Sequence, residues 1–206
     1  MKIALVAPSD HSCGGVAEQL ASRASVDVLT TCRRDDGSLR DFFSPGREQV
    51  ESFCRHRFRS DYATVPALAG RLAAVVFEGE AEPALEARWM QERGPYSSAL
   101  LDHLAAEATG YDVFVFFGLE TATTAFGLAC VGAPSVVVPQ LRDLEILQSR
   151  LLRAAISGAA GFVFGSEEES RAVRQHCGAD IPHATGEELS GASLLEVIER
   201  VTGVTS

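Results

Sequence analysis

Two adjacent glycines, Gly14 and Gly15, lie between a short apolar run and a helical pattern, where a ligand's anionic group could bind. Because glycine has no side chain, backbone N–H groups there can approach a phosphate, and the following helix presents its positive end. The pattern is neither GxGxxG nor a Walker loop, so a tight turn remains an alternative. His11 lies in the same loop, as a ligand contact or as a solvated residue. Cys13 is a candidate nucleophile, although a small buried filler is the favoured interpretation because no base is paired with it.

Polar residues also follow two later apolar runs, which end at residues 117 and 138. Glu120 and Thr121 follow the first run as ligand-contact candidates, with helix capping by Thr121 as the alternative. Arg142 and Asp143 follow the second. Arginine is a permanent cation that can hold a phosphate but cannot serve as a base. We therefore predict a ligand site, without an assigned catalytic residue or metal, at the carboxyl ends of the strands.

The elements that must position these residues alternate along the chain. Short apolar runs typical of buried parallel strands alternate with stretches of helical periodicity. The runs cover residues 3–7, 26–31, 113–117, 135–138 and 161–164, with a last short strand over 181–184. This order predicts an α/β, Rossmann-like, doubly wound and mostly parallel sheet of about six strands, with helices on both faces.

Several local patterns are less regular. Residues 50–58 could form an added strand or hairpin, and residues 144–156 are expected to form one helix. Ser166, with Glu169 three residues later, predicts a capping box at a helix start. A basic cluster at Arg55, His56, Arg57 and Arg59 is interpreted as the solvated face of a strand, with anion binding as the alternative.

Composition narrows the function classes. The chain has 206 residues, enough for about one domain, and its 46% hydrophobic content can build a full core. The net charge of -10 argues against nucleic-acid binding. Five cysteines without CxxC spacing indicate reduced thiols in a cytoplasmic protein rather than a disulfide framework or a zinc site. No apolar run reaches about 18 residues, so no transmembrane segment is expected, and the first residues do not read as a signal peptide.

Three stretches carry a resemblance to a known family. The opening, MKIALVAPSDHSCGGVAEQLASRASVDVLTTCRRD, resembles that of family 4 glycosyltransferases of the GT-B fold, with Gly14, Gly15 and Glu18 matching the loop and first helix. The stretch WMQERGPYSSALLDHLAAEATGYDVFVFF is similar to a "W-M-x-x-x-G-P-Y-S-P-x-L" segment of one subgroup. The stretch VFGSEEESRAVRQHCG resembles an "F-N-T-x-E-E-R-x-L-V" element. The resemblance spans residues 1–184.

The resemblance implies an N-terminal, acceptor-side domain of a retaining glycosyltransferase that requires no metal. In the family a second domain holds the nucleotide sugar through a Glu-x7-Glu element, and the Gly-rich loop faces the donor phosphates. We accordingly divide the chain into a Rossmann-like domain over 1–184 and a linker with a terminal helix over 185–206. The apolar stripe of this helix is expected to pack back on the domain; it comprises Leu194, Leu195, Ile198 and Val201.

Two departures from the family shape the functional hypotheses. No donor-binding half follows residue 184, and Arg142 stands at the family's histidine position, with only Asp143 kept. The first hypothesis is a subunit of a split glycosyltransferase, which meets its nucleotide-sugar donor only with a donor-domain partner. The alternative is a non-catalytic binding or scaffold protein, with self-association through the open cleft face. A complete small enzyme is disfavoured because the sequence shows no nucleophile–base pair.

Overall fold

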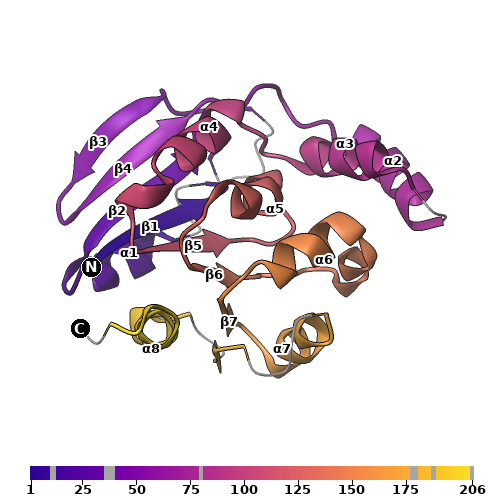
Figure 1. Ribbon diagram of the computed structural model, residues 1–206. Coiled ribbons are helices and arrows are strands. Elements are labelled where there is room, and N and C mark those ends of the chain that lie inside the picture. The colour runs from indigo at the N-terminus through magenta and orange to yellow at the C-terminus, as the bar shows by residue number, and fades with distance from the viewer. Residues whose placement is uncertain (10–12, 35–39, 79–80, 177–180, 187–188, 205–206) are drawn as a thin grey trace.

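One sheet organises the molecule in the computed structural model, which describes residues 1–9, 13–34, 40–78, 81–176, 181–186 and 189–204 (Figure 1). Within those residues the strand order is β3-β4-β2-β1-β5-β6-β7-β8. Every neighbouring pair is parallel except β3 with β4. The strands are β1 (Lys2–Ala7), β2 (Ser25–Thr31), β3 (Gly46–Val50), β4 (Phe53–Phe58), β5 (Val113–Phe117), β6 (Ser135–Val138), β7 (Gly161–Phe164) and β8 (His183–Thr185).

Helices cover both faces of this sheet, which confirms the doubly wound α/β prediction. The α-helices are α1 (Gly14–Ala21), α2 (Pro66–Glu78), α3 (Pro83–Arg93), α4 (Ser98–Ala106), α5 (Ala122–Gly127), α6 (Arg150–Ser157), α7 (Glu167–Arg174) and α8 (Gly191–Thr202). Short 3-10 turns are η2 (Ala108–Gly110), η3 (Leu128–Cys130) and η4 (Leu144–Gln148).

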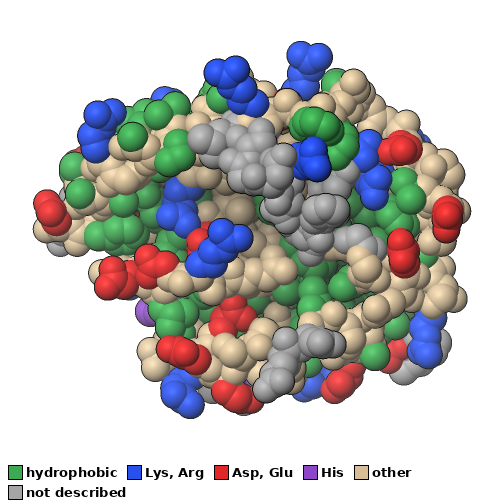
Figure 2. All heavy atoms as spheres, turned by 180° about the vertical axis from the view of Figure 1, so that it is seen from behind, with side chains coloured by type: hydrophobic (Ala, Val, Ile, Leu, Met, Phe, Trp, Pro, Cys, Tyr) green, Lys and Arg blue, Asp and Glu red, His purple; other side chains and the backbone are tan. Residues whose placement is uncertain are grey.

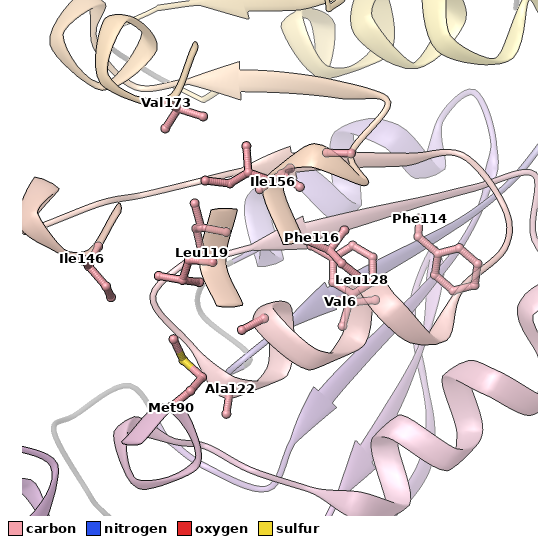
Figure 3. Close-up of a cluster of buried hydrophobic side chains, with 14 of the residues drawn as sticks. Val6, Met90, Phe114, Phe116, Leu119, Ala122, Leu128, Ile146, Ile156 and Val173 are labelled. Carbon is pink, nitrogen blue, oxygen red and sulfur yellow. The ribbon is translucent and has the colours of Figure 1, made fainter. Parts of the chain in front are cut away.

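Alternate residues of each central strand enter two different cores. Phe114 and Phe116 of β5 pack with α3, α5 and α6 on one face (Figure 3), whereas Val113, Val115 and Phe117 pack with α1 and α8 on the other. All five side chains are fully buried, as expected for a parallel strand covered on both sides. Burial on two faces explains why these strands are continuous apolar runs rather than alternating patterns.

The terminal helix α8 lies against β7 and α1. Of its predicted stripe, Leu194, Leu195 and Ile198 are buried and Val201 is half-buried. Gly161 of β7 permits the close approach, since a Cβ there would lie 2.8 Å from a methyl group of Val197. The helix therefore completes one of the two cores, while the domain boundary at residue 184 stays a prediction.

Three local expectations differ from the structure. The sheet has eight strands rather than about six, because residues 46–58 form a complete hairpin at one edge. The basic cluster is not one solvated face: Arg55 and Arg57 are half-buried and both pair with Glu48 on β3, whereas Arg59 is exposed as expected. The single helix expected over residues 144–156 is instead η4 followed by α6, with Ser149 capping the second piece.

The break at Ser149 has a tertiary cause. Its hydroxyl accepts from the N–H of Leu152, as in a helix N-cap, and contacts the buried carboxylate of Glu86 on α3 at 3.3 Å. The same carboxylate accepts from the N–H of Leu151 at 2.9 Å. A residue 63 positions earlier in the chain thus stabilises a new helix start, and local periodicity carries no signal of it.

Candidate functional site

The loop after β1 places the paired glycines at the carboxyl edge of the sheet. Gly14 begins α1, and a Cβ on Gly15 would meet no atom of the described residues within 4 Å, so this helix end is sterically open with respect to them. Cys13 at the N-cap makes no side-chain capping bond and is 2% exposed, which supports its interpretation as a buried filler. His11 lies outside the described residues. Phosphate binding at this end of α1 therefore stays a prediction.

Glu120 is a bridge between three segments. One carboxylate oxygen pairs with Arg93 of α3 at 2.8 Å. The other oxygen accepts from the backbone N–H groups of Arg142 and Asp143 in the loop after β6, the latter at 3.2 Å. The structure thus brings together three of the predicted site residues. Among the described residues, the carboxylate of Glu120 positions the loop after β6. Direct contact of Glu120 with a ligand stays a prediction.

Thr121 has the capping role weighed as its alternative. Its hydroxyl lies 3.4 Å from the N–H of Thr124 in the first turn of α5 and donates to the carbonyl of Gly118 at 2.8 Å. Asp143 has a similar local role, because its carboxylate accepts from the N–H of Glu145 at 2.9 Å and caps η4. The side chains of Thr121 and Asp143 therefore both form hydrogen bonds with backbone groups two or three residues away.

Arg142 differs from these neighbours. Its backbone N–H is held by Glu120, but its exposed guanidinium makes no hydrogen bond or ion pair with any described side chain. The backbone of Arg142 is therefore held in place, while its guanidinium can bind an anion at the carboxyl edge of the sheet. On the face shown in Figure 2, the coloured side chains of both signs are interspersed, so no single-sign basic field dominates this view.

A hollow of about 360 Å³ opens at the carboxyl ends of β6 and β7. Glu169, 7% exposed, fixes its walls by accepting from the N–H of Leu141 at 2.7 Å and from that of Gly165 at 2.9 Å. Ser166 caps α7, as predicted, but the carboxylate of Glu169 joins two loops instead of closing a reciprocal capping box on Ser166. The lining residues are Val138, Gln140, Leu141, Val163, Phe164, Gly165, Ser166, Glu169 and Leu189.

Sequence reasoning missed a second polar group, at the end of β2. Arg33 is 7% exposed and donates from Nη2 to the hydroxyl of Thr64 at 2.6 Å. Burial lowers the pKa of this guanidinium, and the charge of Asp41 opposes the shift. The signal available in the sequence is an arginine two residues beyond a buried strand.

The fold matches solved structures of sugar-synthesising enzymes. A sucrose-phosphate synthase structure from Thermosynechococcus elongatus superposes with a TM-score of 0.51 and 16% identity, covering 98% of this chain and 96% of that chain. Trehalose-phosphate synthases from Burkholderia vietnamiensis and Burkholderia multivorans give TM-scores of 0.50 and 0.51 at 14% and 12% identity. These matches cover 85% and 90% of this chain. The chain has a glycosyltransferase-like fold.

The coverage of those neighbours is unequal. This chain spans 42% and 47% of the two trehalose-phosphate synthase chains, slightly less than half of each. No protein-family model matches the sequence, and no curated protein matches it. The glycosyltransferase-like assignment therefore concerns the fold, and the chemistry must be argued from the site.

The chemistry available at this edge is binding chemistry. The described groups include the open start of α1, the Arg142 guanidinium and the buried pair of Arg33 with Thr64, all suited to hydroxyl or anionic ligands. Within the described residues, no group of three or more His, Cys, Asp or Glu side chains could hold a metal ion. None of the helices there is long and apolar enough to span a membrane.

Proposed function

We propose that this chain is an acceptor-side glycosyltransferase domain of the family 4, GT-B type that works with a separate donor-binding partner. The observation that carries the proposal is the hollow at the ends of β6 and β7, with Arg142 on the loop beside it. It lies at the carboxyl ends of the parallel strands, the edge of the sheet at which doubly wound folds bind their ligands. The glycosyltransferase-like fold supports a sugar as the ligand.

The polar groups around the hollow suit an acceptor sugar rather than an activated donor. Gln140 and Ser166 can exchange hydrogen bonds with hydroxyl groups, and Arg142 can donate to a ring oxygen or an anionic substituent. The carboxylates of Glu120 and Glu169 are engaged by backbone N–H groups. A nucleotide sugar would accordingly be bound by the partner, and the chain itself needs no cofactor.

The test is a titration of the chain with acceptor-type sugars and sugar phosphates, followed by two-dimensional NMR. We expect saturable shifts at the amides of residues 140–142 and 165–166, and no comparable response to a nucleotide sugar alone. Arg142→Ala should weaken the affinity about tenfold, whereas Arg171→Ala, an exposed arginine on α7, should leave it within about twofold. Equal effects of the two variants, or shifts confined to other surfaces, would count against the proposal.

A non-catalytic binding or scaffold role is the second candidate. It is favoured by one observation: among the described residues that line the hollow there is no His, and the carboxylate among them, Glu169, accepts from the backbone N–H groups of Leu141 and Gly165. If neither sugars nor nucleotide sugars bind, this candidate replaces the first, and size-exclusion chromatography with light scattering would test self-association through the same edge. A cytoplasmic location belongs to either proposal and is supported by the free cysteines Cys54 and Cys130.

A further inference from the structure

Arg33 is a buried cation, and few groups around it replace the hydrogen bonds and counter-charge that its guanidinium has in water. Only 7% of its surface is exposed, and its Nε–H is buried without a hydrogen-bond partner. Among the described residues it makes no ion pair, and Asp41, the carboxylate whose charge acts on it, is itself exposed. Removing a guanidinium from water without a close counter-charge is costly. This position is therefore suited to an anion that comes from outside the described chain.

Thr64 gives the guanidinium a polar neighbour that can bind the same anion. Its hydroxyl is buried and accepts from Arg33 Nη2 at 2.6 Å, which leaves the hydroxyl proton without a described acceptor. Arg33 is anchored at its base, because its backbone N–H lies 3.3 Å from the hydroxyl of Thr31, which donates to the carbonyl of Pro8 at 2.6 Å. The two side chains thus have hydrogen-bond donors that no described residue accepts, and the backbone of Arg33 is held by Thr31 at the carboxyl edge of the sheet.

Gly94 packs directly against this pair. It has a φ of +59°, and a Cβ at this position would collide with the hydroxyl oxygen of Thr64 and lie 3.5 Å from Nη1 of Arg33. The absence of a side chain here therefore lets the segment after α3 approach both donor groups. Three separate segments, which follow β2, β4 and α3, meet at this point.

We propose that Arg33 and Thr64 form a binding site for an oxyanion, either the phosphate or the carboxylate group of a small substrate. A guanidinium presents parallel N–H donors that match two oxygens of such a group, and a buried position strengthens the interaction. The inference rests on the proposed function and deepens it, because the acceptor sugar would then carry an anionic substituent. Arg33 would hold that substituent.

The experiment titrates the full chain with inorganic phosphate and, separately, with acetate, at constant ionic strength, and follows backbone amides by NMR. We expect saturable binding with shifts at residues 33, 64 and 94, stronger for the anion class that the substrate carries. Arg33→Met keeps the side-chain stem and should weaken that binding at least about tenfold. Arg34→Met, the matched loss of an exposed neighbouring cation, should leave it within about twofold. Equal weakening by both variants, or no saturable binding of either anion, overturns the inference.

A second variant covers the case in which Arg33→Met fails to fold. Thr64→Val removes the hydroxyl at nearly constant volume, and a threefold or greater loss of anion affinity, roughly the weight of one hydrogen bond, supports the site. An unchanged affinity overturns it. Titration with a neutral sugar and with its phosphate ester separates the two proposals: anion binding at Arg33 while neither sugar shifts the amides around the hollow supports this site and refutes the acceptor role. Sugar binding without anion binding supports the acceptor role and refutes the anion site at Arg33.

Discussion

Replacing Glu120 by glutamine tests whether this carboxylate holds the carboxyl edge together. The side chain is 14% exposed and satisfies three groups: the guanidinium of Arg93 and the N–H groups of Arg142 and Asp143. Glutamine keeps one acceptor oxygen but must turn an NH2 group toward Arg93, which has only donors. The variant therefore loses the ion pair and weakens both backbone contacts.

The expected magnitude follows from these contacts. A hydrogen bond to a charged group contributes about 1.5–3 kcal/mol when buried. Because Arg93 is 29% exposed, solvent screening brings its pair with Glu120 toward the lower end of that range. With the weakened backbone contacts included, we expect the free energy of unfolding to fall by about 2 kcal/mol. For a domain of this size that corresponds to a Tm lower by roughly 4–8 °C.

Thermal and urea unfolding would measure this loss, and hydrogen exchange would locate it. The amides of Arg142 and Asp143 should exchange faster in Glu120→Gln, while amides in β5 keep their protection. Glu145→Gln, which removes an exposed carboxylate from the same loop region, is the matched control and should change Tm by less than about 1 °C. A stable Glu120→Gln protein with unchanged exchange at residues 142 and 143 would refute the bridging role.

Three further substitutions test other parts of the structure. Gly94→Ala should cost about 2 kcal/mol or more in urea unfolding, because its φ is +59° and the new Cβ collides with Thr64. Gly161→Ala should cost about 1–3 kcal/mol, because its Cβ would press on Val197 and displace α8, which near-ultraviolet or NMR spectra would reveal. Burial and nearby positive charge lower the pKa of His56, so the unfolded state binds protons more readily, and stability should fall as pH drops below about 6.5. His56→Gln should reduce that dependence between pH 7.5 and 5.5.

Both glycine variants have a control in the chain. Gly70→Ala and Gly132→Ala place a Cβ where no atom of the described part of the chain lies within 4 Å, and Gly70→Ala should stabilise α2 by about 0.5–1 kcal/mol. If either control is as damaging as its partner, crowding is not the cause. A wild-type slope in His56→Gln would exclude His56 as the source.

Local sequence patterns predicted the elements that need few distant partners. The run over 113–117 is apolar throughout because β5 is covered on both faces, so five consecutive apolar residues are enough to predict its burial. Ser166 caps α7 through a contact three residues away, so its role was visible in the spacing. The order of these elements was sufficient to predict the α/β class. The hairpin at 46–58 was less visible, because β3 is an exposed edge strand with no apolar period.

The sequence by itself thus determined the strands, most helix starts and the doubly wound arrangement, since these depend on hydrophobic periodicity and contacts within a few residues. Only the tertiary structure decided what the site residues do. Glu120 and Glu169 use their carboxylates on backbone groups 22 and 28 residues away, and Arg33 meets Thr64 across 31 residues. The identity of an Asp, Glu or Arg residue does not show whether its side chain is solvated, bridges two segments or is buried. Its role depends on which groups the folded chain brings within hydrogen-bond distance, and no local pattern encodes that.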